Sequence, residues 1–186
     1  GMYRAVTVVA LNDNLDLGDQ DALSRLTEEM PIEIVASPDG DRLIANNIDV
    51  TDRLRDRDVD QNVSQVAAVR GVRTALVRQQ KNIGARGSIV MVGRDIGTVV
   101  LPDASMKVYL DASVEVRANR RHQELQSAHG TLTYQEILQD LVNRDKIDSE
   151  RDVTPLTPAD DALILNTKEL TIEQVVDSIL NEMEIR

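Results

Sequence analysis

The most informative part of the chain lies at residues 88–104, which read SIVMVGRDIGTVVLPDA. Residues 88–92 form a short apolar run bounded by glycine and polar residues, as in a strand buried on both faces of a sheet. Arg94 and Asp95 follow this predicted strand directly. Because ligands of open α/β sheets bind beyond the carboxyl ends of the strands, we expect Arg94 and Asp95 to border a binding site. The alternative is an Arg–Asp ion pair that only stiffens a glycine turn.

Two further apolar runs, at residues 107–110 and 162–165, have the same character. Helical patterns separate or follow these runs at residues 113–128, 133–148 and 171–183, and Thr171 is placed to cap the last helix. Strands that alternate with helices in this way predict a parallel sheet and an α/β fold.

The first half of the chain predicts a different arrangement. Helices are expected at residues 3–11 and 19–29. Between residues 31 and 50 the hydrophobic period changes to two around a Pro-Asp-Gly turn, which predicts a small antiparallel insert. Its strands are expected at residues 32–35, 42–45 and 49–50. Three more helices are expected at 51–57, 62–70 and 72–83, the first capped by Thr51 and the second ended by Gly71.

The composition excludes several classes of protein. The 186 residues include no cysteine and only two histidines, so disulfides and zinc–thiolate sites are excluded and no protein metal site is expected. The apolar runs are far shorter than the roughly 20 residues that a membrane-spanning helix needs. A net charge of −11 argues against a nucleic-acid partner.

Of the 21 basic residues, 17 are arginine, the side chain that binds phosphate with two donors at once. Arg117, Arg120 and Arg121 fall within one turn of a predicted helix, and Arg144 and Arg151 lie seven residues apart. Like charges so close together repel one another, so we expect an anion to bind between them. The alternative is a solvated helix surface with ion pairs at i,i+4 spacing.

A third candidate lies at residues 62–67, which read NVSQVA and are followed by Arg73. A Ser-Gln pair at the start of a helix either caps that helix or binds the edge of a base. The sequence contains no Gly-x-x-x-x-Gly-Lys-Ser/Thr phosphate loop.

Taken together, four segments resemble the bacterial cytidylate kinase family, which phosphorylates CMP and dCMP. They are MYRAVT at residues 2–7, NVSQVA at 62–67 with Arg73, GRDIGTVV at 93–100 and NRDKIDSER at 143–151. The resemblance covers nearly the whole chain in order. It implies a P-loop nucleoside monophosphate kinase-like fold, a three-layer α/β/α core with a parallel sheet. The implied core is residues 1–30, 51–111 and 153–186, with an antiparallel nucleotide-binding insert at 31–50 and an arginine-rich helical lid at 112–152.

The resemblance also implies roles for individual residues. Ser64, Arg73 and Asp95 would recognise the cytosine and the CMP phosphate, and Arg4 and Arg94 would hold the acceptor phosphate. The lid would close on ATP with Arg117, Arg121, Arg144 and Arg151, and so neutralise the transferring group. The implied cofactor is Mg²⁺ with ATP, and the implied location is the cytoplasm.

The sequence departs from the family pattern in two ways. Members of the family begin with a strand, a phosphate loop and a helix, and this chain starts after that unit. We therefore expect it to be inactive as it stands, and to close the gap in its sheet by rearrangement or self-association unless the true start codon lies upstream. The second departure is Val92, where the family often has an acidic residue. The alternative function is a non-catalytic CMP-binding or assembly module, and Ser64 with the Gly-Arg-Asp pattern disfavours an AMP or UMP kinase.

Overall fold

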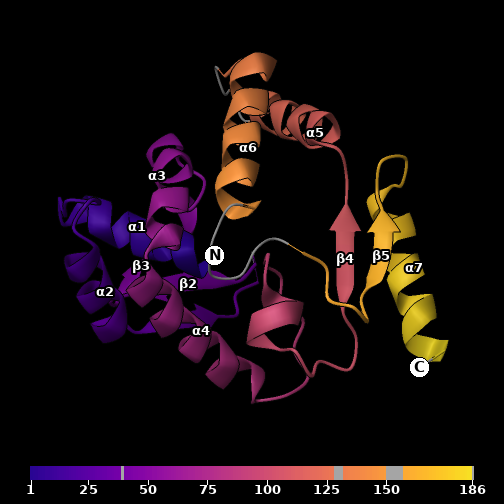
Figure 1. Ribbon diagram of the computed structural model, residues 1–186, viewed down its shortest axis with the longest axis horizontal. Coiled ribbons are helices and arrows are strands. Elements are labelled where there is room, and N and C mark those ends of the chain that lie inside the picture. Colours follow the sequence, from indigo (N-terminus) through magenta and orange to yellow (C-terminus); the bar gives the residue numbers. More distant parts are fainter. Residues whose placement is uncertain (39, 128–131, 150–156, 186) are drawn as a thin grey trace. The chain divides into compact units, whose positions relative to one another are not determined.

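Helix α1 (Met2–Asn12) lies in the core of the first of two units, Gly1–Ile89 and Val90–Arg186, into which the chain divides. Its sequence is apolar nearly all round, and the residues from Ala5 to Ala10 are all buried because α1 contacts other elements on several sides. Figure 1 shows the elements of this computed structural model. The described residues are 1–38, 40–127, 132–149 and 157–185.

Helices α2 (Gln20–Glu29) and α4 (Arg70–Gly84) pack against each other in the first unit. A carboxylate oxygen of Asp19 accepts a hydrogen bond from the Ala22 amide at 2.9 Å and so caps α2. Gly71 was expected to end a helix, but it lies inside α4. A Cβ at this position would lie 2.1 Å from Ser24 Oγ, so the glycine allows α2 and α4 to approach closely.

The predicted antiparallel pairing in the insert is present. Strand β1 (Ile32–Val35) pairs with β2 (Arg42–Ala45), which pairs with β3 (Ile48–Asp49). Between β2 and β3 the chain turns at Asn46 and Asn47, whose φ angles are 50° and 61°. Positive φ at both central residues is the geometry of a two-residue type I′ hairpin, which asparagine tolerates well.

The connection after the insert differs from the prediction in two places. Thr51 is the first residue of a short 3₁₀ helix, η1 (Thr51–Arg53), and its hydroxyl accepts the Leu43 amide at 2.8 Å instead of capping that helix. Helix α3 (Arg57–Ala68) begins five residues earlier than expected, and Val69 separates it from α4. The acidic first turn of α3 stabilises this earlier start, since negative charge is favourable at a helix N-terminus.

The second unit contains a parallel pair of strands, β4 (Val108–Asp111) and β5 (Leu163–Asn166), with Val108 opposite Leu163. Helices α5 (Val114–Ser127) and α6 (Tyr134–Ser149) follow β4 and contact each other. Helix α7 (Ile172–Ile185) follows β5, and Thr171 caps it as predicted, with Gln174 as its partner. The second unit therefore combines helices with a parallel sheet, as expected of an α/β fold.

The strand expected at residues 88–92 does not form. The segment has no regular secondary structure, and Val90 and Val92 are 92% and 89% exposed. A strand needs a hydrogen-bonding neighbour to bury its backbone and its apolar side chains. In the part of the chain that the structure describes, the parallel sheet has two strands, and neither pairs with this segment.

No helix within the described ranges combines the length and the apolar character that crossing a membrane requires.

Candidate functional site

Three of the predicted site residues lie on contacting helices of the first unit. Arg4 is in the first turn of α1, Ser64 is in the middle of α3, and Arg73 is on α4. Helix α3 contacts both α1 and α4. Because α3 starts at residue 57, Ser64 cannot cap it. Ser64 is 9% exposed, and with Arg4 and Arg73 it forms a cluster of candidate residues on contacting helices.

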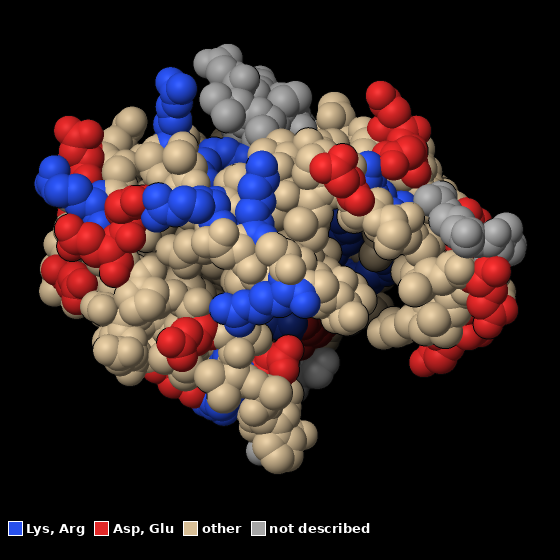
Figure 2. All heavy atoms as spheres, turned by 90° about the horizontal axis from the view of Figure 1, so that it is seen from below, with Lys and Arg blue, Asp and Glu red and all other residues tan. Residues whose placement is uncertain are grey.

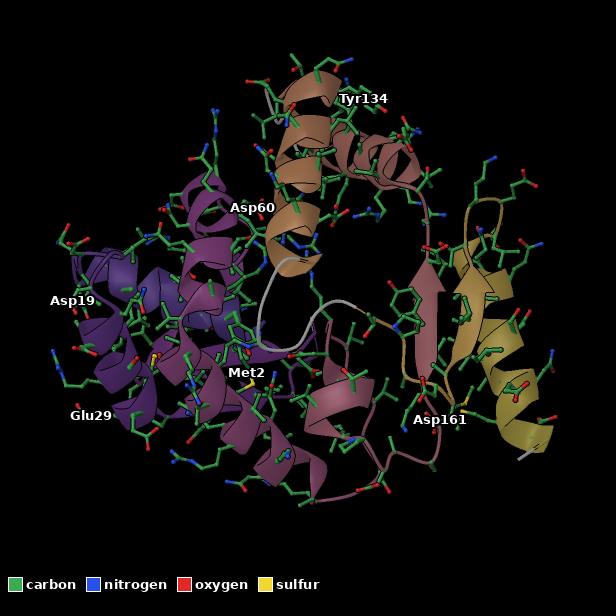
Figure 3. The ribbon with its side chains drawn as sticks, in the orientation of Figure 1. Met2, Asp19, Glu29, Asp60, Tyr134 and Asp161 are labelled. Carbon is green, nitrogen blue, oxygen red and sulfur yellow. The ribbon has the colours of Figure 1, made fainter. Side chains whose placement is uncertain are left out.

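Two acceptors from outside α1 hold the Arg4 side chain. Arg4 Nη1 donates to the Leu54 carbonyl at 2.6 Å, and Arg4 Nη2 donates to Asp60 Oδ1 at 2.5 Å. Asp60, labelled in Figure 3, lies on α3 one turn before Ser64. We did not predict Asp60, although its spacing of four residues from Ser64 places both on one helix face.

Arg73 is only 6% exposed, and its guanidinium carbon lies 5.9 Å from the centre of the Tyr3 ring. A cation over an aromatic face is attracted to it, and burial strengthens that attraction. Tyr3 directly precedes Arg4, so the first turn of α1 contributes two residues to the cluster. Tyr3 was not predicted as a site residue, although it lies in the MYRAVT segment, which is one of the segments that carry the resemblance.

The Gly93–Asp95 segment belongs to the second unit. Asp95 is 8% exposed, and its carbonyl accepts the Val99 amide at 2.9 Å, which starts the short π-helical turn η2 (Ile96–Val100). A Cβ at Gly93 would lie 2.8 Å from Ile96 Cγ1, so this close approach requires glycine. Arg94 and Asp95 are thus held in a tight turn, although the strand expected before them is absent.

The arginines of α5 have partners within the protein. Arg117 binds Asp145, Arg121 Nη1 lies 3.0 Å from Glu124 Oε2, and Arg120 donates to the hydroxyl of Thr167 at 3.1 Å and to its carbonyl. Neither ion pair has the i,i+4 spacing of the alternative, since Asp145 lies on α6 and Glu124 is three residues from Arg121. Anion binding by these arginines stays a prediction.

The Arg117–Asp145 pair links α5 to α6. Arg117 Nη1 and Nη2 donate to the two Asp145 carboxylate oxygens at 3.1 and 2.5 Å. The hydrogen bonds to Asp145, followed by its charge, raise the pKa of the Arg117 guanidinium, which stays cationic. Asp145 was not predicted, although it follows Arg144 in the segment that carries the resemblance.

Arg144 lies on α6, and its Nε atom is buried. The expectation that Arg144 shares a helix face with Arg151 concerns a residue outside the described ranges. Lys107, on the segment before β4, pairs with Asp161 at 2.8 Å. Asp161 is labelled in Figure 3. This pair joins the starts of the two parallel strands, so Lys107 has a structural role.

A hollow of about 480 Å³ lies in the second unit between α5 and the loop after β5. Its position agrees with the rule that ligands bind beyond the carboxyl ends of parallel strands, since α5 follows β4 and the loop follows β5. The residues that line it are mostly polar or charged: Glu115, Val116, Asn119, Arg120, Gln123, Lys168, Glu169 and Leu170. Nothing in the spacing of these residues predicted a hollow, because two segments far apart in the sequence form it.

Acidic and basic side chains alternate over the face shown in Figure 2, where the blue arginines and lysines lie among red and tan atoms. Basic side chains therefore reach the surface of a protein whose net charge is −11.

Comparison with known proteins agrees with the resemblance in the sequence. A sequence profile described as cytidylate kinase matches residues 1–185. The chain is 43% identical over 183 residues to the cytidylate kinase of Bacillus subtilis (strain 168), covering 98% of this chain and 82% of that protein. It is 50% identical over 176 residues to the cytidylate kinase of Exiguobacterium sibiricum, covering 94% and 78% of the two chains. With the α/β units and the arginine clusters described above, these matches show that the chain belongs to the cytidylate kinase family.

Proposed function

We propose that this protein transfers the γ-phosphoryl group of ATP to CMP or dCMP, giving ADP and the nucleoside diphosphate. As a kinase it is a phosphotransferase. The observation that carries this proposal is the family match over residues 1–185, supported by relatives at 43–50% identity. In this reaction an oxygen of the acceptor phosphate attacks the γ-phosphorus, and the bond to the bridging β–γ oxygen breaks.

Five residues are assigned to the acceptor nucleotide, on the resemblance to the family. Arg4 and Arg94 bind the CMP phosphate, and Ser64, Arg73 and Asp95 recognise the cytosine and that phosphate. Cytosine presents an amine that donates and ring atoms that accept, which suits a serine, a carboxylate and an arginine. The burial of Ser64, Arg73 and Asp95 supports this assignment, because buried polar groups discriminate between ligands that do and do not pair with them.

The donor nucleotide is assigned to the second unit. The hollow between α5 and the loop after β5 lies beyond the carboxyl ends of the parallel strands, the usual position of ligands in such sheets. Arg117, Arg121, Arg144 and Arg151, from the lid at 112–152, neutralise the charge that develops on the transferring group. The strands β4 and β5 belong to the proposed three-layer α/β/α core, and the sheet at 31–50 is the proposed nucleotide-binding insert.

Magnesium is proposed to enter with the nucleotide as its ATP complex. Among the residues that the structure describes, no three His, Cys, Asp or Glu side chains are grouped to hold a metal ion. Mg²⁺ in such enzymes is commonly bound by substrate phosphates, water and one or two carboxylates, so ATP itself would supply several of its ligands.

The test is ATP-dependent phosphorylation of CMP, dCMP, UMP and AMP by the purified chain. Turnover of CMP and dCMP that falls at least 100-fold in Arg144→Ala supports the proposal, because removing one charged donor to a transferring group costs about that much. Arg25→Ala, an exposed arginine on α2, is the matched control and should retain activity. CMP binding without turnover would agree both with the inactivity expected from the sequence and with the non-catalytic CMP-binding module.

Self-association through the parallel sheet stays a prediction. Leu110 and Ile164, on neighbouring strands β4 and β5, are 55% and 61% exposed, and apolar surface of this kind favours association. Sedimentation velocity over a range of concentrations measures it, and a concentration-independent monomer would contradict it.

A further inference from the structure

Three hydrogen bonds hold the Arg117 guanidinium in one plane. Its Nε donates to the Ala112 carbonyl at 3.1 Å, and its Nη1 and Nη2 donate to Asp145 Oδ1 and Oδ2. Ala112 directly follows β4, whereas Asp145 lies on α6. The guanidinium is therefore tied at the carboxyl end of a parallel strand, where ligands of α/β proteins bind.

These bonds leave part of the guanidinium available. An arginine has five N–H groups in a fixed fork, and the three bonds use one on Nε and one on each Nη. One N–H on each Nη remains. These two N–H groups point to different sides of the planar guanidinium, and a phosphate oxygen can accept one of them without breaking the pair with Asp145.

We propose that Asp145 is a positioning residue, which holds Arg117 so that a remaining N–H group is oriented toward a nucleotide phosphate before the nucleotide binds. This inference rests on the proposed function, in which Arg117 binds the donor phosphates. A flexible arginine loses rotamer freedom when it binds an anion, and a carboxylate that has already ordered it removes that cost.

The packing of α5 and α6 supports this role. Among the described side chains of these helices, only Ala118 and Ile137 are buried, and Val142 and Ile147 are each 42% exposed. Because so few apolar side chains of these helices are buried, the orientation of α6 depends on specific polar contacts. The bidentate Arg117–Asp145 pair is such a contact, since its fork geometry fixes direction as well as distance.

Electrostatics alone and the positioning role predict opposite effects of removing Asp145 on phosphate binding. Asp145 is negative and close to the cation, so removing it should strengthen the binding of any anion nearby. Positioning predicts that its removal weakens phosphate binding despite the gain in positive charge. Whether the removal of Asp145 weakens or strengthens phosphate binding therefore distinguishes positioning from electrostatics alone.

The probe is inorganic tripolyphosphate, titrated into the full chain by calorimetry at fixed salt. We expect Asp145→Ala to weaken its binding about ten-fold. Asp140→Ala removes the same charge from an exposed site on α6 and should leave the affinity unchanged or slightly higher. Equal or tighter binding by Asp145→Ala, or a wild-type chain that does not bind tripolyphosphate, would overturn the proposal.

Two more variants separate positioning from folding. Asp145→Asn keeps the shape and one acceptor oxygen, and Asp145→Glu keeps the charge, so both should recover part of the lost affinity. A thermal melt of each variant shows whether it is folded. If Asp145→Ala does not fold, the Asp145→Asn titration decides, and unchanged or tighter binding there would overturn the proposal.

The proposed reaction is tested separately by CMP phosphorylation. If the wild-type chain turns over CMP and Asp145→Ala has the same kcat and the same KM for ATP, the positioning role fails while the reaction stands. If the wild-type chain shows no turnover but tripolyphosphate binding falls in Asp145→Ala, the reaction fails and the positioning role stands.

Discussion

At the scale of single residues, two arginines of helix α4 in the first unit differ in their burial. Arg73 is nearly inaccessible and lies over Tyr3, whereas Arg70 on the same helix is exposed. Keeping a guanidinium buried costs several kcal/mol of desolvation unless charge or hydrogen bonds offset it. The ring of Tyr3 is one group that offsets this cost.

Arg73→Lys is expected to weaken CMP binding by roughly 10- to 100-fold. Lysine keeps the charge but loses the planar fork, and a hydrogen bond to a charged group contributes about 1.5–3 kcal/mol. Isothermal titration with CMP measures the change. Arg70→Lys, on the solvent side of α4, is the control; equal losses in the two variants would mean that Arg73 does not contact CMP.

A second residue-scale prediction concerns Gly71. Its Cβ would lie 2.1 Å from Ser24 Oγ and 2.5 Å from Ser24 Cβ, so Gly71→Ala forces α2 and α4 apart. We expect the free energy of unfolding to fall by about 1–3 kcal/mol, the usual cost of overpacking. Urea denaturation measures it. Adding Ser24→Gly should restore most of the loss, and no recovery in the double variant would contradict the steric explanation.

At the scale of elements, the insert is held by a polar network as much as by its apolar side chains. Asp49 Oδ1 accepts the Thr51 amide at 3.0 Å, and its other oxygen binds Arg42. Hydrogen bonds from the Thr51 hydroxyl and amide, followed by one from Arg42, lower the pKa of Asp49 to about 2. This network joins the end of β3 to the start of η1 and to β2.

The lowered pKa predicts how stability depends on pH. In the unfolded chain Asp49 takes up its proton near its ordinary pKa of about 4, but in the folded protein only near 2. Its contribution is therefore fully present above about pH 5 and is lost as the pH falls from 4 to 2. Asp49→Asn should flatten this part of the stability curve.

Chemical denaturation at a series of pH values tests this expectation. Thr51→Ala removes the hydroxyl donor, so it should flatten the curve in the same direction but less. A slope between pH 4 and pH 2 that is identical in wild type and Asp49→Asn would contradict the role of this network.

At the scale of the whole molecule, binding of the proposed nucleotides should stabilise the folded chain, which has 186 residues and a net charge of −11. A ligand that binds only the folded state stabilises it by mass action, by about 2.7 kcal/mol when its concentration is 100 times Kd. For a chain of this size, that corresponds to a rise of about 5–10 °C in Tm.

We therefore expect saturating CMP to raise the unfolding temperature by about this amount, and UMP or AMP to raise it much less. Differential scanning fluorimetry with the three nucleotides makes the comparison. Removing the cytosine contact with Ser64→Ala should reduce the CMP shift. If all three nucleotides shift Tm equally, recognition of cytosine by Ser64, Arg73 and Asp95 is wrong.

Local sequence patterns were enough to predict most of the helices, the strands β1, β2, β4 and β5, and the family, because these depend on periodicity, turn residues and short motifs. They also placed the candidate arginines on α1, α4, α5 and α6, since the order of these residues along the chain carries the resemblance. Two errors in the helix boundaries, at Gly71 and Thr51, arise where side chains of distant elements compete with local signals, and a third is the early start of α3.

Which charged groups meet depends on the folded chain. Asp60 and Asp145 bind arginines 56 and 28 residues away in sequence, and no periodicity encodes such pairs. The same holds for residues 88–92, whose apolar pattern is that of a buried strand. An apolar run becomes a strand only when a neighbouring strand satisfies its backbone, and that neighbour is a property of the folded sheet and not of the segment.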